Sequence, residues 1–140
     1  MKRRSLLLAL AAMPALALAE KPAAGLPADR MVFQMSEGEG GKWVTLLRNL
    51  RNIQAALGRD KVALAVVAIG PGLGMLKADS VVASEVGDAQ MTGVDFVACE
   101  NSMHAQHLAR EDLVEGLSFA AAGYVELMRR QQQGWAYLRP

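Results

Sequence analysis

An apolar run, "KVALAVVAI" at residues 61–69, constrains the fold of this chain more than any other feature. It is rich in valine, and apart from Lys61 it contains no polar residue. Such a run is typical of a central parallel strand that is buried on both faces, because helices must then cover both sides of the sheet. We therefore expect an α/β protein with helices on either side of a mostly parallel sheet.

The other segments alternate between strand-like and helix-like patterns. Strands are expected at 30–36, 61–69, 94–99, 117–122 and 135–140, and helices at 42–57, around 73–77, and at 79–93, 102–109 and 123–133. Alternation of this kind indicates βαβ units and a five-stranded, mostly parallel sheet. The sequence contains no internal repeat that would indicate a solenoid.

Apolar spacing and capping residues predict details of these helices. An apolar stripe in 42–57 recurs at three- to four-residue steps, which is the helical period; its members are Val44, Leu47, Leu50, Ile53 and Leu57. Asp79 or Ser80 is expected to cap the helix over 79–93, and Asn101 or Ser102 the helix over 102–109.

The N-terminal residues have the pattern of a secretory signal peptide. "MKRR" is followed by the apolar "SLLLALAAMPALALA", which ends in an A-x-A cleavage pattern at residues 17–19. We expect a signal peptide at 1–19, a linker at 20–28 and one domain at 29–140, in a periplasmic protein. Arg3-Arg4 is compatible with general or twin-arginine export, and an uncleaved membrane anchor is the alternative.

The charge balance excludes some partners. Residues 1–19 hold three of the 15 Lys and Arg and none of the 14 Asp and Glu, so the rest of the chain has 12 bases against 14 acids. A slightly acidic protein of this kind is not expected to bind nucleic acid or, once the signal is removed, a membrane. No cofactor is indicated, since "GPGLG" at 70–74 lacks the Lys-Ser/Thr of a phosphate-binding loop and does not complete G-x-G-x-x-G. It is expected to be a tight turn.

Cys99 is the candidate functional residue. It is the only cysteine, it ends the strand expected at 94–99, and a helix follows it. Backbone N–H groups at a helix N-terminus stabilise a thiolate, whereas the adjacent Glu100 disfavours one. The alternative is a buried cysteine that packs as a small apolar residue. Because ligands gather at the carboxyl ends of strands, "GPGLG" and Cys99 are expected on the same rim of the sheet.

Both histidines follow Cys99 closely. His104 and His107 are three residues apart, so one helix face can present both. A protonated histidine turned toward Cys99 would help to stabilise the thiolate. The alternative is that the two histidines bind a metal. A metal site would use Cys99, His104 and His107, with Glu100 or Met103 as further ligands. The spacing matches no established metal motif, and two surface histidines are the simpler interpretation. We therefore expect no metal.

Several segments, taken in order, resemble the DsrE/DsrF-like family of small sulfur-relay proteins, in particular its exported, single-cysteine branch. These are "VVAIGPGLGML", "GVDFVACENSM", "EDLVEG" and "AAGYVELMRRQQQGWAYLRP", and the resemblance spans about residues 30–140. It implies a flavodoxin-like three-layer fold that assembles into trimers or hexamers. It also implies that Cys99 carries sulfur as a persulfide. Where many relatives have a histidine before the "GPG" turn, this chain has Ile69.

Two functions follow as expectations. The first is an exported sulfur carrier or thiol-dependent sulfur-transfer protein that exchanges sulfur with donor and acceptor proteins or small thiols. In it Cys99 bears the persulfide, and His104 or His107 shuttles a proton. The alternative is a non-catalytic, homo-oligomeric module that binds a ligand or protein and has Cys99 buried. Thiol reactivity separates the two.

Overall fold

A computed structural model describes residues 25–140. The signal peptide expected at 1–19 and residues 20–24 of the expected linker lie outside the described residues. The strands are β1 (Asp29–Met35), β2 (Val62–Ala68), β3 (Asp95–Cys99), β4 (Ser118–Ala120) and β5 (Ala136–Leu138). The α-helices are α1 (Gly40–Leu57), α2 (Ala83–Met91), α3 (Glu100–Ala105) and α4 (Gly123–Gln132). A 3₁₀ segment, η2, covers Gly70–Leu76.

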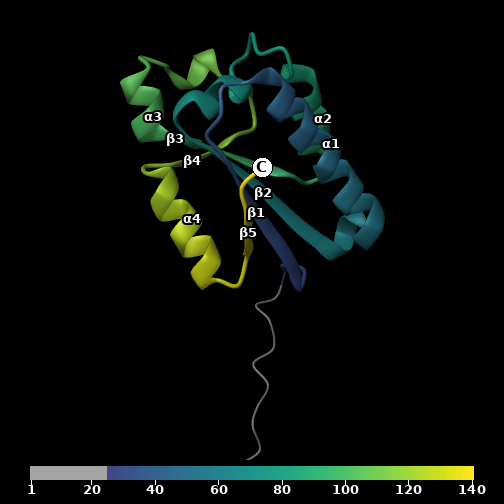
Figure 1. Cartoon of the computed structure of the whole chain (residues 1–140). Helices are drawn as coiled ribbons and strands as arrows, with labels where there is room; N and C mark the ends of the chain where they lie inside the picture. The colour runs from purple at the N-terminus through teal and green to yellow at the C-terminus, as the bar shows by residue number, and fades with distance from the viewer. Residues whose placement is uncertain (1–24) are drawn as a thin grey trace, which may run out of the picture.

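The five strands form one all-parallel sheet in the order β4-β3-β2-β1-β5. Figure 1 shows α1 and α2 on one side of this sheet and α4 on the other, so the molecule has three layers. This is a flavodoxin-like α/β fold, and it confirms the class that the sequence predicts. In the part of the chain that the structure describes, no helix is long and apolar enough to cross a membrane.

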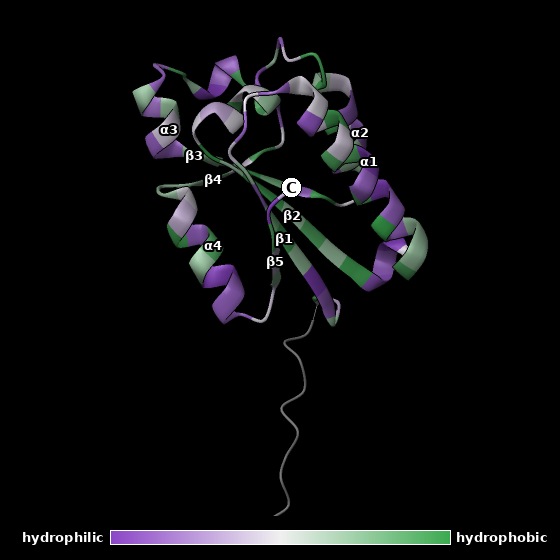
Figure 2. Cartoon of the chain, in the orientation of Figure 1, coloured by the Kyte–Doolittle hydropathy of each residue, from purple (hydrophilic) through white to green (hydrophobic). Residues whose placement is uncertain are grey.

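The run at 61–69 lies where its composition predicts. β2 is buried between β1 and β3, and residues 64–68 have at most 2% of their surface exposed. Alternate residues contribute to two separate apolar clusters. Leu64, Val66 and Ala68 belong to the cluster under α1 and α2, whereas Ala65 and Val67 belong to the cluster under α4. Figure 2 shows hydrophobic colour concentrated on these central strands.

The helix expected at 42–57 is present as α1. Its buried residues are Trp43, Leu46, Leu47 and Leu50. Val44 and Leu57, which share the apolar period, are 52% and 42% exposed. The Trp43 indole anchors the helix, because its Nε1–H donates to the Glu37 carbonyl at 2.8 Å.

Both predicted side-chain N-caps are also wrong. α2 begins at Ala83, after Val82, and Ser80 instead accepts a hydrogen bond from the Val82 N–H at 3.3 Å in the preceding turn. α3 begins directly after Cys99, with no side-chain cap. Its first turn follows the strand without a loop, so Asn101 and Ser102 already lie inside the helix.

Gly72 allows η2 to pack on the end of β1. A Cβ at this position would overlap the carbonyl of Met35 and lie 3.0 Å from the Ser36 nitrogen. The Met35 carbonyl already accepts the Ile69 N–H at 2.9 Å, so it is fixed in place. Only glycine permits this approach of two backbones, which places the "GPGLG" turn beside the carboxyl ends of β1 and β2.

Candidate functional site around Cys99

Cys99 is the last residue of β3 and faces α4. Strand alternation sends Phe96 and Ala98 into the cluster under α1 and α2, and Val97 and Cys99 into the cluster under α4. The Cys99 side chain is 3% exposed. The thiol therefore lies beneath the first turn of α4, not on the open rim of the sheet.

Gly123, the first residue of α4, lies directly against the thiol. Its backbone N–H donates to Cys99 Sγ at a distance of 3.2 Å. A Cβ on Gly123 would lie 2.6 Å from Ile69 Cγ1 and 3.2 Å from Cys99 Cβ. The absence of that Cβ lets the helix backbone reach the sulfur. Sequence reasoning considered only the helix that follows Cys99, and it missed Gly123 because 24 residues separate the two.

Nearby polar groups shift the pKa of the Cys99 thiol. Burial raises this pKa, but the Ser102 hydroxyl and the backbone N–H groups of Ser102, Gly123 and Asn101 lower it. The Gly123 N–H makes the hydrogen bond to the sulfur, whereas the Asn101 N–H donates to the Ala121 carbonyl at 3.2 Å. The net result is a pKa below the ordinary value for cysteine. Donors fixed by the backbone stabilise a thiolate because they need no reorganisation when the charge forms.

Ser102 connects the thiol to the "GPGLG" turn. Its Oγ accepts the Gly70 N–H at 2.8 Å, which leaves the hydroxyl proton free to point at Cys99. Gln106, which follows α3, donates from Nε2 to the Gly70 carbonyl at 2.8 Å. The N–H and the carbonyl of Gly70 are therefore both hydrogen-bonded, the first to Ser102 and the second to Gln106. Gly70 adopts a φ of +55°, a region that favours glycine. The turn and the strand end that bears Cys99 lie at the same end of the sheet, as expected, but the thiol itself is covered by α4.

The two histidines do not join this site. His104 and His107 are exposed, and no hydrogen bond between the described residues links either of them to Cys99. Glu100 pairs with Arg110 at 3.3 Å. Among residues 25–140, no three His, Cys, Asp or Glu side chains lie close enough together to hold a metal ion.

A hollow of about 310 Å³ lies between the end of β4 and α4. Ala120, the register partner of Cys99 in β4, lines it together with Ala121 and Ala122. Glu126 and Arg129 of α4 form its polar side. Ala120 therefore connects this hollow to the strand end that bears the thiol.

The fold has a structural relative. A protein of unknown function from Methanobacterium thermoautotrophicum superposes with a TM-score of 0.77 and is 36% identical, over 80% of this chain and 99% of the other. The two proteins belong to one family. The match extends over the whole α/β domain of the relative and supports the fold described above. No protein-family model matches the sequence, and no curated protein matches it.

The role of Ser102 predicts a measurable change in this site. Ser102→Ala removes the hydroxyl donor to Cys99 and the acceptor for the Gly70 N–H, so we expect the pKa of Cys99 to rise. The rate of alkylation at neutral pH should fall several-fold, because less thiolate is present. Ser84→Ala, an exposed serine of α2, is the matched control. An unchanged thiol pKa in Ser102→Ala would contradict the assigned contact.

Proposed function

We infer that the protein is a DsrE-like sulfur carrier in which Cys99 holds a persulfide. The observation that carries this proposal is the hydrogen bond from the Gly123 N–H to Cys99 Sγ at 3.2 Å. The nearby Ser102 hydroxyl supports it, because it lowers the pKa of the same thiol. A cysteine that merely fills space needs no such donors, since a neutral thiol is a weak acceptor. Donors of this kind stabilise an anionic sulfur, which is the form that attacks.

The proposed reaction has two balanced halves. The Cys99 thiolate attacks the outer sulfur of a persulfide donor, so that a new S–S bond forms on Cys99. The bond within the donor breaks, and the donor leaves as a thiolate. In the second half an acceptor thiolate attacks the outer sulfur on Cys99, which takes that atom and releases the Cys99 thiolate. No external oxidant or reductant is required, because the transferred sulfur atom keeps its oxidation state in both halves.

Access to the sulfur must accompany the reaction. Ile69 and the first turn of α4 pack against Cys99, and Ile69 is 9% exposed. The hollow lined by Ala120, Ala121 and Ala122 offers room for an outer sulfur once that turn moves. Ile69 occupies the position where the resemblance leads one to expect histidine. Proton transfer in this chain therefore uses solvent or a residue of the sulfur donor or acceptor protein. We assign no step to His104 or His107, given their exposure.

The proposal includes export and self-association. Export to the periplasm rests on the signal pattern at 1–19, and a homo-oligomer rests on the resemblance. Val81 and Met91, which are 79% and 85% exposed, are apolar side chains that an assembly would cover.

A second function is favoured by one specific observation. Cys99 is only 3% exposed, which fits a binding module in which the thiol is a core residue. One experiment distinguishes the two functions: the protein is incubated with glutathione persulfide, and its intact mass is then measured. The carrier should gain one sulfur atom and lose it again to an added thiol, whereas a binding module should gain none.

A further inference from the structure

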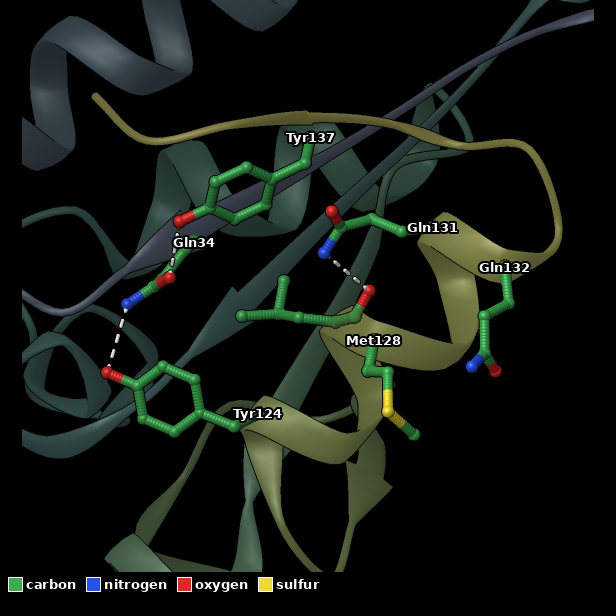
Figure 3. Close-up of a pocket in the computed structure, with 7 residues that line it drawn as sticks. Gln34, Tyr124, Met128, Gln131, Gln132 and Tyr137 are labelled. Atoms are coloured by element: carbon green, nitrogen blue, oxygen red, sulfur yellow. Dashed lines mark hydrogen bonds between the residues drawn. The ribbon is translucent and has the colours of Figure 1, made fainter.

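A groove of about 520 Å³ lies on the α4 face, away from the hollow at the end of β4. It is bounded by β1, β5 and one side of α4 (Figure 3), and its lining residues are Gln34, Tyr124, Leu127, Met128, Gln131, Gln132 and Tyr137. Its volume is in the range of small-molecule sites, about 300–1,000 Å³.

A buried amide organises this groove. Gln34 is 3% exposed and is the only buried polar side chain among the described residues. Its Oε1 accepts the Tyr137 hydroxyl at 2.6 Å, and its Nε2 donates to Ser36 Oγ at 2.8 Å and to the Tyr124 hydroxyl at 3.3 Å. The amide thus joins two tyrosines that are 41% and 64% exposed and holds their hydroxyls at the groove.

The hydrogen bonds leave a defined set of free groups. Tyr124 accepts from Gln34, so its own O–H remains free to donate. Tyr137 donates to Gln34, so its oxygen remains free to accept. Gln131 uses its Nε2 on the Leu127 carbonyl at 3.1 Å, which leaves Oε1 as another acceptor. The groove therefore offers the Tyr124 donor and the Tyr137 and Gln131 acceptors above an apolar base formed by Leu127 and Met128, and the Gln132 amide adds a further donor and acceptor at its edge.

The groove carries no charge. Its lining residues include no Asp, Glu, Lys, Arg or His. Arg139, which follows β5, pairs with Glu37 at 2.9 Å. A charged ligand would give up hydration here for neutral partners only, because no lining residue carries the opposite charge.

We propose that this groove binds a planar, uncharged aromatic ligand that carries a carboxamide or lactam edge. The ring packs on Met128 and between the two tyrosines. The ligand carbonyl accepts the Tyr124 O–H, and its N–H donates to Tyr137 or Gln131. This site is independent of Cys99 and of the sulfur chemistry proposed above, and holds whether or not the thiol reacts.

The test uses two probes of the same shape, of which the second carries a negative charge and lacks the amide N–H. The ¹⁵N-labelled protein is titrated with benzamide, and separately with benzoate, while backbone and side-chain amide resonances are followed by NMR. We expect saturable benzamide shifts at Gln34, Tyr124, Met128, Gln131 and Tyr137, and at least tenfold weaker binding of benzoate. Tyr124→Phe keeps the ring and removes the donor, and should weaken benzamide binding about tenfold. Asp88→Asn, an exposed change on α2, should have no effect.

Three results would overturn the proposal. One is equal binding of benzamide and benzoate, and another is unchanged benzamide binding by Tyr124→Phe. The third is a shift of the Tyr124 and Tyr137 resonances with protein concentration alone, which would mean that a second copy of the chain covers the groove. Loss of sulfur uptake by the protein would leave the benzamide result unaffected, so the two proposals fail separately.

Discussion

Protein carrying Cys99→Ser is expected to take up no sulfur from a persulfide donor, whereas the unchanged protein gains one sulfur atom. The loss should be complete, because Cys99 is the only cysteine in the chain and no other side chain forms a persulfide. Serine is close in size to cysteine and can keep the contact with the Gly123 N–H, so the site retains its shape. Intact-mass spectrometry after incubation with glutathione persulfide measures the uptake.

The control for this variant is its fold. Burying a hydroxyl in the cluster under α4 should cost roughly 1–2 kcal/mol in the free energy of unfolding, which leaves the protein folded at 25 °C. Circular dichroism and the unfolding midpoint check this. Ser84→Ala, far from the thiol, should gain sulfur like the unchanged protein. Sulfur uptake by Cys99→Ser would contradict the assignment of the carrier atom.

Gly72→Ala should destabilise the protein by roughly 2–4 kcal/mol, the range of severe overpacking and backbone strain. The added Cβ would overlap the Met35 carbonyl, which is held by the Ile69 N–H at 2.9 Å. Either η2 or the end of β1 must then move, and both lie next to the site. Urea unfolding of the two proteins at one temperature measures the difference in free energy.

Gly87→Ala provides the matched control for that measurement. Gly87 lies inside α2, and a Cβ there would meet nothing within 4 Å. Replacement of a helical glycine by alanine should stabilise the protein by about 0.5–1 kcal/mol. Both substitutions replace glycine by alanine. Changes of opposite sign in the free energy of unfolding would therefore show that the close approach at Gly72 causes the loss of stability. A loss below about 0.5 kcal/mol at Gly72 would contradict the contact.

Much of the fold could be predicted from the sequence, because it depends on local patterns. The valine-rich run at 61–69 indicates a strand buried on both faces, and the alternation of segments indicates the parallel sheet. Apolar spacing indicates the helix at 42–57, but it does not decide which of the adjacent Trp43 and Val44 is buried. In the structure Trp43 is buried, and its indole donates to the Glu37 carbonyl.

The site could be predicted only in part, because its contacts join distant segments. Cys99 and the turn were placed on one rim from strand ends alone. The groups that act on the sulfur come from elsewhere: Gly123 is 24 residues away along the chain, and Ser102 has the sequence signature of a helix cap. The pair of Gln34 and Tyr137 spans 103 residues, and nothing in the sequence signals it.

The central claim is that the fold stabilises Cys99 as a thiolate, and alkylation by iodoacetamide against pH tests it most directly. The rate follows the thiolate fraction. The reagent can require a transient opening of α4 to reach the sulfur. The rate then still levels off above the pKa of the folded state, because nearly all molecules are folded and their thiol is ionised above that pH. The unfolded protein provides the reference, with an apparent pKa of about 8.5.

The account predicts that the folded protein reacts with an apparent pKa below that of the unfolded protein, and that Ser102→Ala shifts it upward. A folded protein that reacts with the pKa of the unfolded chain or a higher one, or only after unfolding, would contradict the account. Cys99 would then be a buried core residue, and the function of the protein would have to lie in binding.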